Sequence, residues 1–318
     1  MKKIISVLMA LTMLLSAALL VGCGETKKDV YTVGICQLVT HDALDAATQG
    51  FKDALTEKLG ADKVVFDFQN AANDINACPT IMNNFVTKKV DLIMANATPA
   101  LQAAYSATNK IPILGTSVTE YGVALGIENF SGTVGSNVSG TSDLAPLDQQ
   151  AAMITELFPD TKTVGILYCN AEPNSKYQVD VITAELAKKN ITVKPFAFSD
   201  SNDVASVTNA ACADSDVLYI PTDNTAATCK ETIGNIVLTA KKPVITGEQG
   251  ICVGCGVATL SISYYDLGYK TGEMAAEILQ GGDITKMPIQ YAPAQKMYNK
   301  AMADALGVTI PEGYTEIK

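Results

Sequence analysis

Polar side chains that could hold a small charged molecule gather directly after the predicted strands. Four hydroxyl residues there can donate hydrogen bonds to a carboxylate, and backbone N–H groups at helix starts can add more. Three acidic residues can bind an ammonium group through charge-assisted hydrogen bonds. The hydroxyl set is Thr98, Ser117, Thr119 and Ser142, and the acidic set is Asp143, Asp223 and Glu248. Together these residue types fit a zwitterionic ligand.

Three tyrosines could supply an aromatic wall for the side chain of such a ligand, namely Tyr121, Tyr168 and Tyr177. Helix capping is the alternative explanation for single members of the polar set, because Thr98 and Ser175 are common N-cap types. Ligands of open parallel sheets bind beyond the carboxyl ends of the strands. The gathering of polar residues at those ends therefore favours a ligand cleft.

The charge inventory restricts what the chain can bind. All 23 basic residues are lysines, so a ligand carboxylate cannot be held by the bidentate guanidinium group of arginine. The formal net charge of −10 over 318 residues argues against nucleic acid, which needs a basic face.

Catalysis is not indicated. His41 is the sole histidine, and the motifs of nucleophilic and phosphate-binding sites are missing from the sequence. We expect no catalytic residue, no metal ion and no cofactor. The enzyme alternative is an esterase that uses Ser175 with His41.

The N-terminus predicts export. Lys2 and Lys3 precede an apolar run over 4–20, and residues 1–22 have the pattern of a signal peptide. Gly22 before Cys23 resembles the lipobox of bacterial lipoproteins, which places a lipid on Cys23 and makes residues 23–30 a tether. A plain membrane anchor is the alternative, although the run is slightly short for a span. We expect the protein on the extracytoplasmic face of the cell membrane.

Seven further cysteines cannot all pair with one another, and their scattered spacing is not a disulfide framework. Cys252-Val-Gly-Cys255 could be a redox or metal pair. The favoured interpretation is two small buried residues in a glycine-rich turn.

The elements that must position these residues alternate between short β-branched runs and amphipathic stretches. Strands are predicted over 31–36, 64–68, 91–95, 113–116, 163–168, 192–198, 217–220, 244–246 and 256–263, and helices over 42–59, 75–88, 99–108, 175–189, 204–213, 226–240 and 265–280. This order predicts an α/β fold with parallel sheets flanked by helices.

An internal repeat indicates two similar lobes. Thr32-Val-Gly-Ile35 recurs as Thr163-Val-Gly-Ile166, and Asp91-Leu-Ile93 recurs as Asp216-Val-Leu218. The stretch Asn129–Asp143 is rich in Gly, Ser and Asn, and we interpret it as the first crossover between the lobes, where a hinge needs adaptable backbone.

Several short stretches together carry a family resemblance over nearly the whole mature chain. They include Val33-Gly-Ile-Cys-Gln37, Ala97-Thr-Pro-Ala100, Gly140-Thr-Ser-Asp143, Glu172-Pro-Asn-Ser175, Pro221-Thr-Asp-Asn224 and Tyr264-Tyr-Asp-Leu-Gly268. The chain resembles the ABC-transporter substrate-binding proteins, whose members include tryptophan- and other aromatic amino acid-binding lipoproteins.

The resemblance implies a type I periplasmic-binding-protein fold, with two Rossmann-like lobes joined by three crossovers. It divides the chain into an N-terminal lobe of 31–141 plus 264–290 and a C-terminal lobe of 142–263 plus 291–318. The family's cleft positions fall on the residues above and add Gln37, Asn174, Ser175 and Asn224. Tyr121 departs from the family, which commonly has proline there, so it could contact the ligand or reshape the loop.

The expected function is that of a solute-binding lipoprotein of an ABC importer, with a permease and its ATPase as partners. The expected ligand is a small zwitterion, an aromatic amino acid, in a cleft between lobes that closes on binding. The alternatives are a nucleoside or sugar ligand on the same fold, or a sensor lipoprotein that presents its ligand to a receptor.

Overall fold

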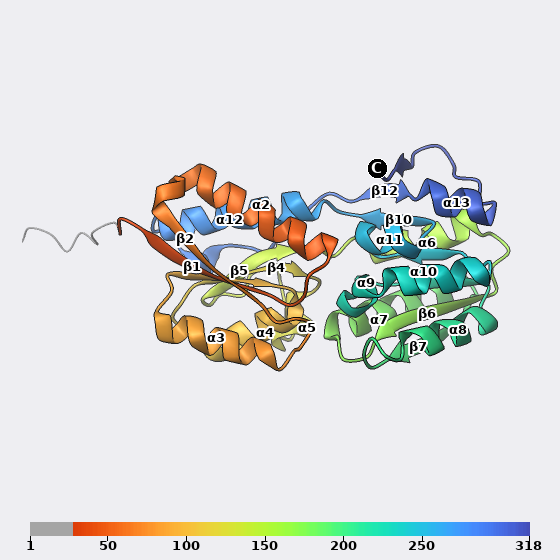
Figure 1. The fold of residues 1–318 in the computed structure, drawn as a ribbon, viewed down its shortest axis with the longest axis horizontal. Coiled ribbons are helices and arrows are strands. Elements are labelled where there is room, and N and C mark those ends of the chain that lie inside the picture. Colours follow the sequence, from red (N-terminus) through yellow and green to blue (C-terminus); the bar gives the residue numbers. More distant parts are fainter. Residues whose placement is uncertain (1–27) are drawn as a thin grey trace, which may run out of the picture.

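The computed structural model describes residues 28–318, so the predicted signal peptide and Cys23 lie outside the described residues. Two mostly parallel sheets flanked by helices lie end to end along the long axis of the molecule (Figure 1). We call the six-stranded sheet with its helices the first lobe and the seven-stranded sheet with its helices the second lobe. The predicted α/β fold with two Rossmann-like lobes is confirmed.

The first lobe has the strand order β11-β5-β4-β3-β1-β2. Its strands are β1 (Tyr31–Gln37), β2 (Val64–Asn70), β3 (Leu92–Asn96), β4 (Ile113–Val118), β5 (Val138–Ser142) and β11 (Gln290–Tyr291). One face packs on α2 (Asp42–Leu59) and α12 (Tyr264–Leu279), and the other on α3 (Ala77–Lys88), α4 (Thr98–Ala107) and α5 (Tyr121–Leu125). Alternate residues of β1 supply both faces: Val33 and Ile35 join the α2 side, and Cys36 joins the α3 side.

The second lobe has the strand order β13-β12-β10-β9-β8-β6-β7. Its strands are β6 (Thr163–Cys169), β7 (Thr192–Phe198), β8 (Val217–Ile220), β9 (Val244–Thr246), β10 (Ala258–Ser261), β12 (Gln295–Tyr298) and β13 (Thr315–Glu316). Helices α6 (Leu147–Leu157) and α7 (Pro173–Ala187) cover one face, and the other carries α8 (Val204–Asp214), α9 (Asn224–Thr228), α10 (Lys230–Thr239), α11 (Gln249–Cys255) and α13 (Lys300–Leu306). Short 3₁₀ turns occupy Ala61–Lys63 and Ile284–Lys286.

The two sheets share one strand order. β2-β1-β3-β4-β5 of the first lobe corresponds to β7-β6-β8-β9-β10 of the second. The repeated aspartates have the same role in both lobes, because Asp91 Oδ2 accepts a hydrogen bond from Thr32 N and Asp216 Oδ2 accepts one from Thr163 N. In each lobe the strand order reverses beside the first strand, which is where ligands of such sheets bind.

The chain passes between the lobes three times, after β5, after β10 and after β11. Helix α12 follows the second crossover and packs tightly on α2, since a Cβ on Gly268 would lie 1.9 Å from the carbonyl oxygen of Ala47. This close approach fixes the start of α12, and so Tyr264, against the first lobe.

Two predictions about local structure are wrong. The stretch 129–143 is not only a crossover, because Val138–Ser142 forms β5 inside the first sheet. The helix predicted over 226–240 divides at Cys229, whose φ of −106° and ψ of 9° interrupt the helix between α9 and α10.

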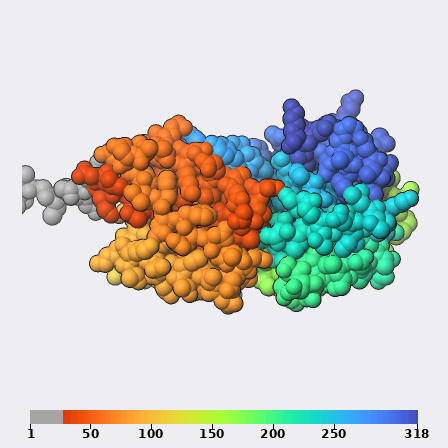
Figure 2. All heavy atoms as spheres, viewed as in Figure 1, coloured from red at the N-terminus to blue at the C-terminus, as the bar shows by residue number. Residues whose placement is uncertain are grey.

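The facing ends of the lobes touch. Figure 2 shows the orange N-terminal segment against the teal segment of the second lobe. Within residues 28–318, no helix combines the length and the apolar character needed to cross a membrane.

Candidate functional site

A narrow cavity lies where the carboxyl ends of both sheets meet, with a volume of about 10 Å³, which is roughly the room that one water molecule needs. Its lining residues come from both lobes and from the second crossover. They are His41, Ala43, Leu44, Ser117, Asp143, Asn174, Thr222, Asp223, Asn224, Ala227, Glu248 and Tyr264. The lobes close tightly over this space, so a ligand larger than water enters only when they part.

Ser117 reaches the cavity because β4 is irregular there. The register with β5 shifts between Gly115 and Val118, and Ser117 has a φ of 53°, which is uncommon for a residue other than glycine. The Ser117 hydroxyl is buried and has no hydrogen-bond partner in the protein. The bulge therefore presents a free hydroxyl to the cavity.

Asp143 follows β5 and is fixed by one of its two carboxylate oxygens. Its Oδ2 accepts a hydrogen bond of 2.9 Å from the Tyr264 hydroxyl, and its Oδ1 is buried without a partner. Burial raises the pKa of Asp143 to about 6, since water no longer stabilises the charge. A cationic ligand group would supply the missing partner.

Asp223 and Asn174 form the second-lobe side. Asp223 caps α9 by accepting from Ala226 N at 2.8 Å, and its other oxygen accepts from Cys169 N and from the Ser175 hydroxyl. Burial, reinforced by the charge of Glu172, raises the pKa of Asp223 to about 8. The side chain of Asn174 donates to Thr222 O at 3.1 Å, and its Oδ1 is left without a partner.

Two glutamates hold the loops of the second lobe in place. Glu248 caps α11 by accepting from the backbone N–H groups of Gly250 and Ile251, and burial raises its pKa to about 7. Glu172 lies just behind the cavity and accepts from the backbone and side chain of Asn224 and of Thr225, at 2.6–3.0 Å. Both carboxylates are buried.

His41 connects the lobes across the cavity. Its Nε2 lies 3.3 Å from Asn224 Oδ1, and Asn224 in turn donates to Glu172. Burial lowers the pKa of His41, with the bond to Asn224 acting in the opposite direction. A neutral imidazole that donates from Nε2 satisfies this geometry.

Three of the seven unpartnered buried side-chain atoms found in residues 28–318 belong to residues that line the cavity: Ser117 Oγ, Asp143 Oδ1 and Asn174 Oδ1. Buried polar groups are nearly always hydrogen-bonded in folded proteins, so this convergence on one cavity marks a place for a polar guest. No lysine lies among the residues that line it.

The structure brings six of the sequence-predicted residues to the cavity: Ser117, Asp143, Asn174, Asp223, Asn224 and Glu248. Five others are buried and lie outside the lining: Gln37, Thr98, Thr119, Ser142 and Ser175. Gln37 bonds within the first lobe to Val39 O and Asp45. The Ser142 hydroxyl donates to Thr119 O. The Ser175 hydroxyl donates to Asp223, which lines the cavity.

The proposed tyrosine wall is not at the cavity. Tyr121 packs against Phe130 in the first lobe, and its hydroxyl donates to Thr141 O at 3.1 Å. Gly115 and Gly140 leave the space that this hydroxyl occupies, so the tyrosine fills the core instead of contacting a ligand. Tyr168 and Tyr177 are also outside the lining, where the one aromatic ring besides His41 is Tyr264.

Sequence reasoning missed His41, Thr222 and Tyr264 in the lining and Glu172 behind it. Glu172 and Thr222 follow strands just as the selected residues do, so their position was the available signal. Tyr264 starts a helix after a crossover, and nothing in the residue type distinguishes it from a packing tyrosine.

Ser175 and His41, the pair of the esterase alternative, make hydrogen bonds to other side chains and not to each other. Ser175 donates to Asp223 at 2.8 Å, and His41 faces Asn224 instead of a hydroxyl. Residues 28–318 hold no cluster of three or more metal-ligating side chains. Cys252 and Cys255 are unpaired and buried, and the Cys255 thiol donates to Ile251 O.

Comparison with known proteins identifies the family. The family model for ABC transporter substrate binding proteins matches residues 32–316. A tyrosine-binding protein of Clostridioides difficile (strain R20291) is 36% identical over 303 residues, covering 91% of this chain and 87% of the relative.

Two solved structures differ in how well their lobes superpose. An ABC domain from Streptococcus pneumonia in complex with L-Trp has a TM-score of 0.86 at 32% identity, covering 91% of this chain and all of that one. The ligand-free, open structure of a Clostridium difficile substrate-binding protein with adhesive properties has a TM-score of 0.70 at 38% identity, covering 91% and 99%. The lobes therefore take an arrangement closer to the ligand-bound relative than to the open one.

The family and these relatives consist of solute-binding proteins, which confirms the expectation that the chain is not an enzyme. The chain belongs to the ABC transporter substrate-binding protein family.

Proposed function

We propose that this protein captures a free aromatic amino acid in the interlobe cavity and delivers it to an ABC importer. One observation carries the proposal: Ser117 Oγ, Asp143 Oδ1 and Asn174 Oδ1 are buried, unpartnered and convergent on one cavity. The two oxygen acceptors match an ammonium group, and the hydroxyl can donate to a carboxylate.

The charge of the lining supports a ligand that brings its own cation. Asp143, Asp223 and Glu248 line the cavity without a lysine, and burial raises the pKa of each. An ammonium group within hydrogen-bond distance of Asp143 would favour the ionised carboxylate. Acidic amino acids would instead place a second carboxylate among these groups, so the site should select against them.

The aromatic side chain is proposed from the relatives, one named for binding tyrosine and one solved with L-Trp. Apolar contacts from Leu44, Ala43, Ala227 and the ring of Tyr264 could cover it. Closure retains the ligand, because both lobes contact it only in the closed form.

A thermal-shift panel tests the ligand class, with amino acids, nucleosides and sugars added to the purified protein. A ligand at 100 times its Kd should stabilise the fold by ~2.7 kcal/mol. Tyrosine, tryptophan or phenylalanine should raise Tm, and N-acetyltyrosine, which lacks the ammonium group, should not. A shift with a sugar or nucleoside and none with aromatic amino acids would reject the proposed ligand.

We also propose that the protein is anchored to the extracytoplasmic face of the cell membrane through a lipid on Cys23. The support is the sequence pattern of residues 1–23 alone. Metabolic labelling with a radioactive fatty acid should mark the wild-type protein in its host and leave Cys23→Ala unlabelled. Equal labelling of both would remove the anchor at Cys23.

A further inference from the structure

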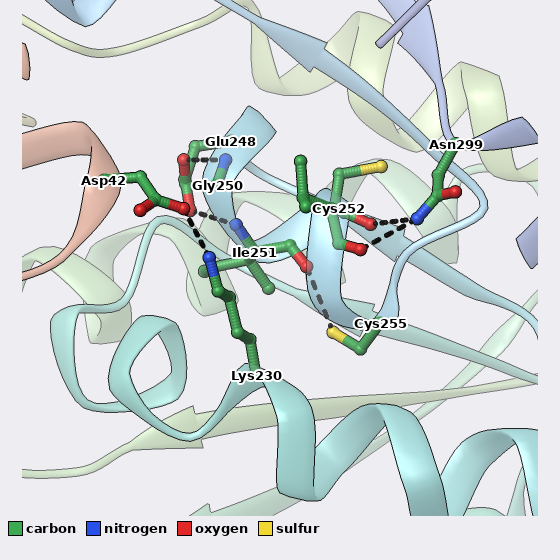
Figure 3. Close-up of polar contacts among 9 residues, drawn as sticks. Asp42, Lys230, Glu248, Gly250, Ile251, Cys252, Cys255 and Asn299 are labelled. Carbon is green, nitrogen blue, oxygen red and sulfur yellow. Dashed lines mark hydrogen bonds and ion pairs between the residues drawn. The ribbon is translucent and has the colours of Figure 1, made fainter. Parts of the chain in front are cut away.

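One charged contact joins the two lobes. Lys230 at the start of α10 donates to Asp42 at the start of α2, as Figure 3 shows. The other ten ion pairs in residues 28–318 each lie within one lobe. A neutral contact between the lobes joins Asn73 Nδ2 to Thr225 Oγ1 at 3.3 Å. Within residues 28–318, the contacts between the lobes thus include a single ion pair, at the polar edge of the interface.

Lys230 is held by its own lobe, whereas Asp42 is open to solvent. The Lys230 side chain is 18% exposed and that of Asp42 is 67% exposed. The stem of Lys230 lies over Gly254 of α11, where an added Cβ would stand only 2.5 Å from Lys230 Cγ and 2.7 Å from its Cβ. The glycine thus makes room for the lysine, and α10 and α11 keep the ammonium group at the rim.

Lys230 also stands beside the cavity wall. Its charge acts on Glu248, which lines the cavity and caps α11 through Gly250 and Ile251. In Figure 3 the Glu248 carboxylate lies near Asp42 and Lys230, at the boundary between α2 and α11. The ammonium group lies near the Glu248 carboxylate of its own lobe, and it pairs with Asp42 across the lobes.

We infer that Lys230 sets the lifetime of the closed form by pairing with Asp42 across the lobes, and that Gly254 positions it. This inference rests on the proposed function in one respect, that closure retains the ligand. A contact made only in the closed form slows opening, so it acts on the rate of ligand release more than on the rate of capture.

The experiment measures tyrosine dissociation by stopped flow for the wild type, Lys230→Gln, Asp42→Asn and the double variant. The dissociation rate constant should rise about two- to five-fold in each single variant, as expected for one partly exposed ion pair. The double variant should match the single ones, because both remove the same contact. Added salt should speed release from the wild type and have little effect on Lys230→Gln.

Two further variants separate the contact from general effects. Lys176→Gln removes a lysine that pairs with Asp180 within α7, and it should release tyrosine at the wild-type rate. Gly254→Ala should displace the Lys230 stem and speed release like Lys230→Gln while leaving the pair's residues in place. An unchanged dissociation rate in Lys230→Gln, or effects of the two single variants that multiply in the double variant, would overturn the inference.

A second measurement keeps the inference independent of the ligand. Small-angle scattering of the ligand-free protein should give a larger radius of gyration for Lys230→Gln than for Lys176→Gln or the wild type. If tyrosine fails to bind the wild type, the proposed ligand is wrong, and the scattering alone decides the role of Lys230. Identical radii in that case would overturn it.

Discussion

The Tyr264 hydroxyl donates a 2.9 Å hydrogen bond to Asp143 Oδ2, which ties together the first and second crossovers between the lobes. Asp143 directly follows β5, and Tyr264 begins α12, which packs closely on α2. The bond fixes the carboxylate so that its second oxygen, Oδ1, remains buried and free beside the cavity. Asp143 therefore belongs both to the first crossover between the lobes and to the candidate site.

Asp143→Asn should weaken tyrosine binding by roughly 2–5 kcal/mol, because the ligand ammonium loses a buried counter-charge. The ligand-free variant should be as stable as the wild type or more so, since burial already raises the pKa of this carboxyl to about 6. Calorimetric titration and thermal melts measure the two effects. Asp266→Asn is the control, an exposed aspartate in the first turn of α12. Unchanged affinity in Asp143→Asn would remove it from the site.

Ser117→Ala should reduce affinity about ten-fold or more, the effect of a hydrogen bond to a charged group worth ~1.5–3 kcal/mol. Its hydroxyl has no partner within the protein, so the ligand-free Tm should not fall. Ser139→Ala is the matched control, because the buried Ser139 hydroxyl donates to Met287 O at 3.0 Å. The control should lose stability and keep its affinity. A Ser117→Ala variant that loses stability but not affinity would give the hydroxyl a structural role.

The ligand-free protein should become less stable as pH rises from about 6.5 to about 8.5. Burial raises the pKa of Glu248 to about 7 and of Asp223 to about 8, so the folded protein binds more protons than the unfolded chain in this range. Stability therefore falls across this range, where the unfolded chain has already released these protons, and the fall levels off once the folded carboxyls ionise above about pH 8. The lowered pKa of His41 acts in the opposite direction, but only below about pH 6.5.

A ligand cation should reverse part of that loss, so the shift in Tm caused by tyrosine should be larger at the higher pH. Urea unfolding of the ligand-free protein at several pH values measures the slope, and Asp223→Asn should flatten it. Stability that rises between pH 6.5 and 8.5 would show that these carboxylates are not the groups that titrate.

Much of the fold could be predicted from periodicity. The helix expected over 42–59 is α2, and the one expected over 265–280 is α12, displaced by one residue. β5 was missed because Val-Ser-Gly-Thr-Ser has weak strand propensity. A Cβ on Gly140 would meet the backbone of Gly115 at 2.1 Å and the Tyr121 hydroxyl at 2.3 Å. Position 140 requires glycine because of contacts with residues distant in the sequence. Strand propensity depends on neighbouring residues alone, so it gives no information about those contacts.

The candidate site could be predicted in part for the same reason. The rule that parallel sheets bind ligands at their carboxyl ends found Ser117 and Asp223. It could not separate residues that line the cavity from buried residues outside the lining, such as Gln37 and Ser175, since both kinds come at or after the ends of strands. That distinction depends on side-chain direction. The direction of the Ser117 side chain comes from a bulge in β4, and no sequence pattern predicts that bulge.

Glu172→Gln should destabilise the protein by ~1–3 kcal/mol, because an amide NH₂ would face donors that now meet a carboxylate. Four hydrogen bonds from Asn224 and Thr225 end on this side chain. Urea unfolding measures the loss. Glu185→Gln is the control, on the surface of α7 beside Lys188, and it should stay within ±0.5 kcal/mol. A Glu172→Gln variant as stable as the control would show that the carboxylate charge does not hold these loops.

Of the seven cysteines described, Cys229 should be the one that reacts quickly with a water-soluble disulfide reagent. It is partly exposed between α9 and α10, whereas the other six are buried. Burial raises the pKa of Cys169 to about 11 and of Cys252 to about 12, and the thiolate is the reactive form. Cys229→Ser should therefore abolish the fast phase, with the remaining thiols appearing only in denaturant. Rapid loss of two thiols in the Cys229→Ser variant, with a Cys252–Cys255 crosslink in the peptide map, would instead make the CxxC segment a redox pair.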